Sequence, residues 1–280
     1  DVNESVKKHL QYENIKIANE LSKGVQDIFL KTFITMVNWF VLKEVGDRNA
    51  ENRMIELEKL MKENEIPPFI TSIYIGWKLY LLTENDRIEE ANRFAAQHGI
   101  QTNKKISHIN ETVYQAYARL LLIQGKTDEA EKLISELFDQ VYKGNKIERM
   151  IDLNVLYAML YKLKGNHQEA LSYLIEAMNL AVDENLVSFF VYNANYIEDL
   201  IDEVFKIHNS PGTLRGKTKI PATFLENLQQ AIEKKKRIRK NRHASELSTR
   251  EIDTLKLMAG DLSNQEIADE LFISINTVKT

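Results

Sequence analysis

The chain has 280 residues, enough to bury more than one hydrophobic core, so two domains are expected. It contains ten Gly, four Pro and no Cys, which excludes disulfides and cysteine-based zinc sites and disfavours a turn-rich β-sandwich. Helix-forming residues dominate the rest of the sequence, and we predict an all-α protein.

Charge is distributed unevenly along the chain, whose net charge is −4. Residues 1–205 carry 23 basic and 32 acidic side chains, residues 206–243 carry 11 and 2, and residues 244–280 carry 3 and 7. The overall sign argues against a nucleic-acid partner, but the basic middle segment could contact phosphate.

No part of the sequence indicates a membrane segment. No stretch approaches the roughly 20 apolar residues that span a bilayer. The N-terminus is polar from Asp1 to Asn14, unlike a secretory signal. We therefore expect a soluble, cytoplasmic protein without a membrane partner. Because the chain begins with Asp1 and stops inside a helical pattern, we also expect it to be part of a longer protein.

A repeat of about forty residues runs through the first two thirds of the chain. Helix-turn-helix units are predicted at residues 39–55, 79–95, 118–134 and 158–174. The expected turn residues lie 40, 39 and 40 positions apart: Gly46, Asp86, Gly125 and Gly165. Before each turn stands Leu42, Leu82, Leu121 or Tyr161, and five residues after it stands Glu51, Ala91, Ala130 or Ala170.

Each predicted unit has the features of a helical hairpin. Gly after a helix adopts the left-handed backbone conformation without a Cβ penalty, and Asp tolerates it better than most residues. The position five residues after the turn is a small residue in three of the four units. A buried stripe is predicted three and four residues beyond that position, for example at Met54 and Ile55 or at Leu133 and Ile134. One hairpin cannot bury its apolar face, so we predict a stacked solenoid. The pattern resembles tetratricopeptide repeats.

Aromatic residues gather in the repeat region and have two interpretations. A face lined by some of them could bind a small-molecule effector or a protein partner, whereas ordinary inter-helix core is the commoner role for each one. The residues are Phe33, Trp39, Phe40, Phe69, Tyr74, Trp77, Tyr80, Tyr114, Tyr117, Tyr157, Tyr161, Phe189, Phe190, Tyr192 and Tyr196.

A linker and a basic helix are predicted after the repeats. Residues 209–221 collect Pro and Gly and read as a connection. A helix from Ala222 to about Asn241 follows and runs into a basic segment with seven cations in nine residues. Two interpretations of these cations remain: they either lie on an ordinary solvated surface or contact phosphate without sequence specificity. The residues are Lys234, Lys235, Lys236, Arg237, Arg239, Lys240 and Arg242.

Residues 247–280 predict three short helices from capping signals alone. Ser248 with Glu251, and Ser263 with Glu266, fit the capping box that marks a helix start. The middle helix is expected at residues 264–271, with Ile267 and Leu271 buried, and the third helix begins after Ser274. The short connection between them is typical of DNA-binding helix-turn-helix units, whose last helix enters the major groove.

The segment SNQEIADELFISINTVKT, with Thr249, Arg250, Glu251, Leu255, Ala259 and Gly260 before it, resembles LuxR-type regulators. With helical repeats upstream, the chain is similar to the large MalT-like members, which bind ATP through a part that precedes the repeats. The resemblance implies an all-α repeat solenoid (1–208), a linker and basic helix (209–246) and a LuxR-type helix-turn-helix (247–280).

The resemblance also implies the DNA-contacting residues. Lys279 and Thr280 should lie against base edges or nearby phosphates. Ser263, Asn264, Gln265 and Thr277 should face the DNA backbone. Because the pattern stops at Thr280 within the recognition helix, we expect the chain as it stands to bind DNA weakly or not at all. Promoter DNA, an effector or partner protein at the repeats and a second copy of the chain are the expected partners.

Two other function classes remain for comparison. A protein-interaction scaffold would use the repeats to bind a peptide or protein, with the C-terminal helices as a dimer contact. An enzyme is disfavoured because the six His are scattered and no Ser/His/Asp or metal-ligand spacing occurs. We expect no cofactor and no metal in this chain.

Overall fold

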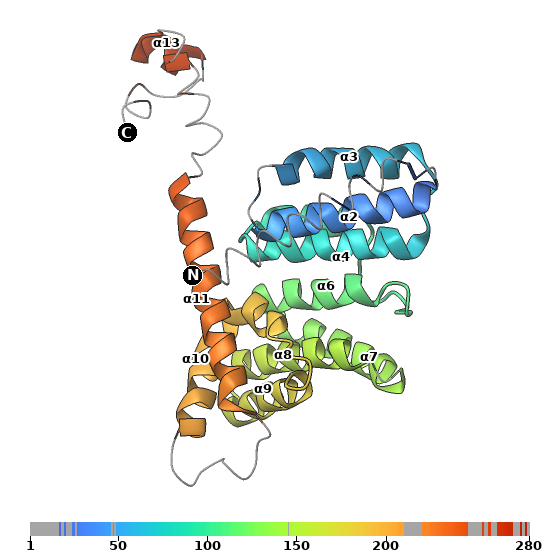
Figure 1. Ribbon diagram of the computed structural model, residues 1–280, viewed down its shortest axis with the longest axis vertical. Helices are drawn as coiled ribbons and strands as arrows, with labels where there is room; N and C mark the ends of the chain where they lie inside the picture. Colours follow the sequence, from blue (N-terminus) through green and yellow to red (C-terminus); the bar gives the residue numbers. More distant parts are fainter. Residues whose placement is uncertain are drawn as a thin grey trace. The chain divides into compact units, whose positions relative to one another are not determined.

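The computed structural model describes residues 27–45, 47, 49–144, 146–209, 220–245 and 262–270, with single positions 17, 20, 24, 25, 254, 257, 258, 275 and 278. Every regular element in these residues is a helix, which confirms the all-α class (Figure 1). The chain divides into two compact units, Asp1–Ile232 and Glu233–Thr280, and each is described by itself.

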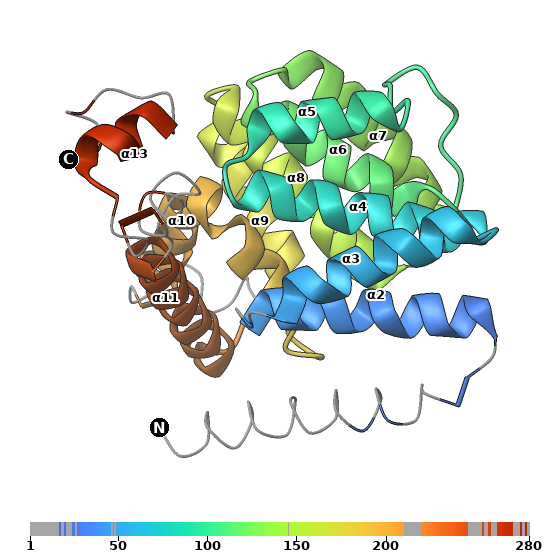
Figure 2. The ribbon, with the colours of Figure 1, turned by 90° about the horizontal axis from the view of Figure 1, so that it is seen from above.

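The first unit is a stack of antiparallel helix pairs. The pairs are α2 (Ile28–Val45) with α3 (Asn49–Glu63), α4 (Pro68–Glu84) with α5 (Ile88–Gln97), α6 (Glu111–Ile123) with α7 (Thr127–Lys143), and α8 (Ile147–Leu163) with α9 (His167–Ala181). The first helices of successive pairs contact one another, and α8 also contacts α10 (Ser188–Asn209). Figures 1 and 2 show this succession, which confirms the predicted repeat solenoid.

The turns between paired helices have the predicted left-handed residue. The φ angles of Asp86, Gly125 and Gly165 are 59°, 72° and 77°. In each turn, the N–H of the following residue donates to the carbonyl oxygen of the residue four positions before the turn residue. After Gly125, this bond joins the Lys126 N–H to the Leu121 carbonyl oxygen at 2.9 Å. This hydrogen bond is characteristic of a Schellman motif, so the repeat period reflects a C-terminal helix cap that recurs in each repeat. Gly46 lies outside the described residues.

The small residues after the turns are buried where the paired helices meet. Ala91, Ala130 and Ala170 have no exposed surface. The prediction for the first repeat was wrong by one position, because Glu51 and Ile55 are exposed. Ala50 and Leu57 are buried there instead. Burial of α3 against α2 selects the apolar face of α3, and that face starts one residue earlier than the constant spacing indicated.

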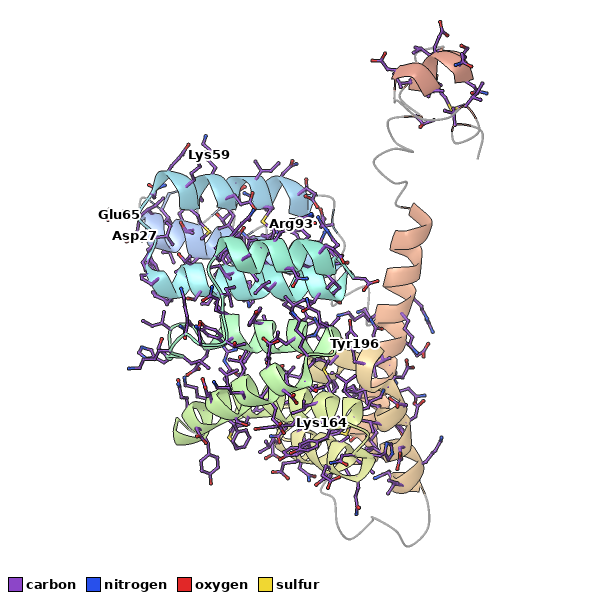
Figure 3. All side chains as sticks on the ribbon, turned by 180° about the vertical axis from the view of Figure 1, so that it is seen from behind. Asp27, Lys59, Glu65, Arg93, Lys164 and Tyr196 are labelled. Carbon is purple, nitrogen blue, oxygen red and sulfur yellow. The ribbon has the colours of Figure 1, made fainter. Side chains whose placement is uncertain are left out.

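The first helices of the second and third repeats approach closely at a glycine. A Cβ built on Gly76 of α4 would lie 2.8 Å from the carbonyl oxygen of Thr112 on α6 and 2.7 Å from its Cγ2. Real side chains do not approach backbone at that distance, so only glycine permits this packing. Charged side chains such as Lys59, Arg93 and Lys164 are exposed on the surface (Figure 3).

The start of the helix after the linker belongs to the repeat core. Helix α11 (Ala222–Ser245) begins within the first unit, and its early apolar side chains join the same buried cluster as α6 to α10. The ring of Phe224 meets the ring of Phe190 on α10 edge-to-face, with centroids 6.1 Å apart. The buried members from α11 are Phe224, Leu225, Leu228 and Ile232.

Candidate functional site

In the second unit, the start of helix α13 (Asn264–Glu270) is built by the predicted capping box. The backbone N–H of Ser263 donates to Glu266 Oε2 at 2.8 Å, and the Ser263 hydroxyl donates to the same oxygen at 2.7 Å. The Glu266 N–H lies 3.4 Å from Ser263 Oγ, to which it donates. The hydrogen bonds from Ser263 hold the pKa of the Glu266 carboxyl below its usual value. The local helix start is therefore confirmed.

The faces of α13 differ in exposure as a helix-turn-helix requires. Ile267 and Ala268 are buried, whereas the predicted backbone-facing residues Ser263, Asn264 and Gln265 are exposed. Val278, in the segment of the predicted third helix, is partly buried. Leu271, Ser248, Glu251 and Ser274 lie outside the described residues, as do the predicted contacts Thr277, Lys279 and Thr280. The DNA-contacting roles stay predictions.

The basic segment lies on α11. Lys234, Lys236 and Arg237 are exposed, and Lys235 is partly buried. Lys236 Nζ lies 3.8 Å from Glu233 Oε1, one turn earlier on the same helix. Arg239, Lys240 and Arg242 occupy helical positions, but their side chains lie outside the described part of the structure. A phosphate-contacting role for these cations stays a prediction.

Within the first unit, five helices surround a hollow. It is lined by the first helices of the four repeats, α2, α4, α6 and α8, together with α10. The hollow has a volume of about 150 Å³ and is partly open to solvent. The lining combines aromatic rings with two arginines and one aspartate, and the polar groups are Thr112, Gln115, Arg119, Arg149, Asp152 and Asn193.

Arg119 is the buried polar centre beside the hollow. Its Nε donates to Asn193 Oδ1 at 2.8 Å, Nη2 donates to the Tyr192 carbonyl at 3.2 Å, and Nη1 donates to Thr83 Oγ1. The guanidinium also lies over the Tyr80 ring, 4.9 Å from its centroid. All these partners are neutral. Arg119 thus links α6 to α4 and α10.

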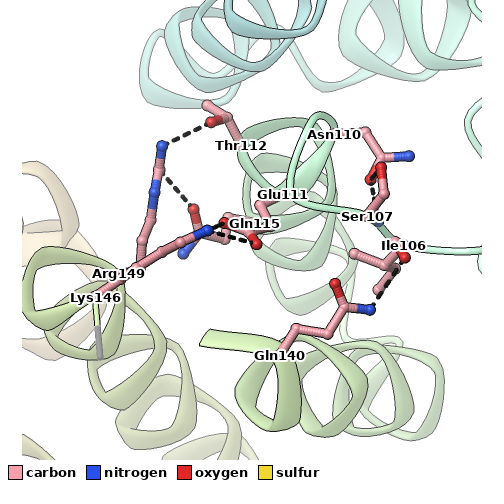
Figure 4. A network of polar contacts seen from close by, with 9 residues as sticks. All are labelled: Ile106, Ser107, Asn110, Glu111, Thr112, Gln115, Gln140, Lys146 and Arg149. Carbon is pink, nitrogen blue, oxygen red and sulfur yellow. Dashed lines mark hydrogen bonds and ion pairs between the residues drawn. The ribbon is translucent and has the colours of Figure 1, made fainter. Parts of the chain in front are cut away.

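Arg149 on α8 is the second arginine of the hollow, and it contacts α6. Its guanidinium donates to Gln115 Oε1 at 2.7 Å and to Thr112 Oγ1 at 2.9 Å (Figure 4). Nearby, Lys146 Nζ pairs with the Glu111 carboxylate at 2.8 Å, also between α8 and α6. Burial raises the pKa of Asp152, while the charges of Arg149 and Arg119 act in the opposite direction.

The core interpretation is confirmed for part of the aromatic set, and other members line the hollow, where ligand binding stays a prediction. Trp39, Tyr74, Tyr114 and Phe190 are buried in the core. The rings that line the hollow are Phe40, Trp77, Tyr80, Phe189 and Tyr192.

The polar groups of the hollow were not predicted. Arg119 nevertheless stands out in the sequence, because it interrupts the apolar run from Ala118 to Leu122. Most of the helix that contains it is buried. A charge in such a position requires partners, and those partners mark a polar site. Arg149 and Asp152 give no comparable signal, since α8 has polar residues at both ends.

Comparison with known families identifies both parts of the chain. A family model described as the MalT-like TPR region matches residues 25–206, more than half of the chain. The chain belongs to this family. A second model, bacterial regulatory proteins of the luxR family, matches residues 245–280. No solved structure matches the chain.

The MalT-like chain therefore carries the DNA-binding domain of a LuxR-type transcription regulator after its repeats. Neither matched region is a catalytic domain. Among the described residues, no group of three or more His, Asp or Glu side chains could hold a metal ion. No described helix is long and apolar enough to cross a membrane.

Proposed function

We propose that the repeats of this MalT-like chain receive an effector, and that the C-terminal domain binds promoter DNA in response. The observation that carries the proposal is the presence, in one chain, of a repeat region over residues 25–206 and a LuxR-type domain over residues 245–280. A repeat solenoid supplies a large binding surface, and a helix-turn-helix supplies a DNA reader.

In this proposal, the DNA contacts of the C-terminal domain come from the exposed start of α13 and from the residues after it. Ser263, Asn264 and Gln265 are exposed, while Ile267 on the same helix is buried. In this proposal the first three residues position the domain on phosphates, and Lys279 and Thr280 contact base edges or nearby phosphates. Phosphate contacts set the register of the domain, and contacts with base edges give sequence specificity.

Coupling between the two parts would proceed through assembly. Effector binding in the repeats favours an oligomer, and several DNA-binding domains then meet repeated DNA sites together, which raises their joint affinity. Analytical sedimentation with and without candidate effectors measures this step. An oligomeric state that no effector changes would contradict the assembly mechanism.

Footprinting on promoter DNA tests the proposed function in the full-length protein. We expect a defined protected site, and we expect Gln265→Ala to weaken the protection. Gln168→Ala is the matched control, because Gln168 is also an exposed glutamine near a helix start, on α9 of the repeats. Absence of any protected site would favour the alternative function, a scaffold whose repeats bind a peptide or protein.

A further inference from the structure

The hollow inside the repeats has the construction of a ligand site. Its aromatic wall includes Phe40 and Trp77, whose ring centroids are 4.3 Å apart, and Tyr192, whose ring lies 5.1 Å from that of Tyr80. Polar groups converge on the same space from α6 and α8. An apolar wall with a few placed polar groups is the usual composition of a small-molecule site.

One buried hydrogen-bond donor at the hollow has no partner. Gln115 is only 4% exposed, and its Nε2 makes no hydrogen bond within the described part of the chain. Its Oε1 accepts from Arg149, which identifies the amide oxygen and leaves Nε2 as the atom without a partner. Buried amide donors are nearly always paired in folded proteins, so this N–H group points to a missing acceptor.

Arg149 has donors available beside that amide. A guanidinium carries five N–H groups, and the structure uses two of them here, toward Gln115 and Thr112. Among the described residues neither Arg149 nor Arg119 forms an ion pair with a carboxylate at salt-bridge distance. Two guanidiniums and one carboxylate, that of Asp152, give the lining a formal charge of +1.

We propose that the hollow binds a small organic carboxylate with an apolar or aromatic body, held by Arg149 and Gln115 and stacked against Trp77. The planar guanidinium fork matches a carboxylate, and the Gln115 amide supplies a further donor. A single negative charge balances the formal charge of +1 on the lining, whereas a dianionic phosphate ester would leave one negative charge unbalanced in the hollow. A hollow of about 150 Å³ suits a small molecule better than a peptide. The interpretation of this site as the effector site rests on the proposed function.

Fluorescence titration of the full chain tests the proposal. The chain has two Trp, and Trp77 lines the hollow while Trp39 is buried. The probes are acetate, benzoate, phenylacetate and indole-3-acetate, each paired with its neutral amide, and phenyl phosphate. We expect saturable quenching by at least one aromatic carboxylate, at least about tenfold weaker binding of its amide, and loss of the signal in Trp77→Phe.

Two variants locate the site. Arg149→Gln should weaken carboxylate binding at least about tenfold, and Lys164→Gln, a change at an exposed lysine just after α8, should leave it unchanged. Asp152→Asn should bind at least as tightly as wild type, an outcome that misfolding cannot produce. Circular dichroism checks that each variant is folded.

The outcomes separate this inference from the proposed function. No binding by any carboxylate, equal binding of acid and amide, preference for phenyl phosphate, or full affinity in Arg149→Gln would overturn the carboxylate site. The titration contains no DNA. If the chain binds the carboxylate but the full-length protein protects no promoter, the regulator function is contradicted and the site is left standing.

Discussion

Arg119 on α6 donates its Nε–H to Asn193 on α10 at 2.8 Å, and both side chains are buried. The two residues are 74 positions apart in the chain, so this bond joins the third repeat to the helix that follows the fourth. Asn193 Nδ2 in turn donates to the Phe189 carbonyl at 2.9 Å, which sets the orientation of the amide.

A double-mutant cycle measures this connection. Asn193→Ala should lower the free energy of unfolding by about 1–3 kcal/mol, because it leaves the Arg119 N–H unpaired in the interior. Arg119→Met should lower the free energy of unfolding by at least as much, and the coupling energy between the two substitutions should be about 0.5–3 kcal/mol. The control cycle uses Asn92 and Gln124, an exposed pair hydrogen-bonded at 2.6 Å, for which we expect coupling near zero. Equal coupling in both cycles would contradict the role assigned to Arg119.

Gly76→Ala should destabilise the repeats. The added methyl group would meet the Thr112 backbone, an overpacking that costs about 1–3 kcal/mol, and the better helix propensity of Ala returns only about 1 kcal/mol. Gly144→Ala is the control, because a Cβ there meets only the flexible Lys146 side chain. Denaturant titration should show a lower midpoint for Gly76→Ala alone. A midpoint at or above that of wild type would mean that α4 and α6 separate without cost.

Buried and partly buried tyrosines predict unfolding at alkaline pH. Burial raises the pKa of Tyr74, and the neighbouring Glu58 raises it further; burial is also the main cause at Tyr114, Tyr117, Tyr157 and Tyr173. A pKa that is higher in the folded state gives stability that is complete below the ordinary value of 10.0 and is lost as the pH rises above it. Phenolate absorbance and loss of helical circular dichroism should therefore rise together. Ionisation of these tyrosines with the helices intact would contradict their burial.

Ser263→Ala should raise the pKa of Glu266 part of the way toward its ordinary value of 4.5, because it removes the hydrogen bond of the Ser263 hydroxyl, the larger lowering contribution, and keeps the backbone one. The depressed pKa means that this carboxylate favours the capped helix above about pH 4.5 and that the effect fades as the pH falls through the lower, folded-state value. NMR titration of the Glu266 side chain measures the shift, and Ser263→Thr, which keeps the hydroxyl, should retain the low pKa. An unchanged titration in Ser263→Ala would show that the capping box does not form.

Features with a local cause were predictable from the sequence. The stop at Gly125 and the buried Ala130 after it follow from the chemistry of a Schellman turn and of a close helix pair, and the same holds for Ser263 with Glu266. The first repeat was misaligned because Ala50 and Glu51 are neighbours, and only the packing of α3 against α2 decides which of them is buried.

Features that join distant residues could not be predicted in this way. Nothing near Arg149 in the sequence indicates that it meets Thr112, 37 positions away. The apolar spacing of Phe224, Leu225 and Leu228 indicates a helix with one buried face, but it does not say that this face packs on the repeats. The hollow arises where five helices meet, and therefore depends on the tertiary structure.

The central claim is tested most directly by the affinity of the full-length protein for promoter DNA, measured against salt concentration. Wild type is compared with Lys279→Ala and with Lys132→Ala, a control at an exposed lysine on α7. We predict sequence-specific binding by wild type and by the control. Lys279→Ala should bind more weakly, with a log–log salt slope flatter by up to about 0.9 for one lost phosphate contact. No sequence-specific binding by wild type at low salt, or equal binding by Lys279→Ala, would contradict the account.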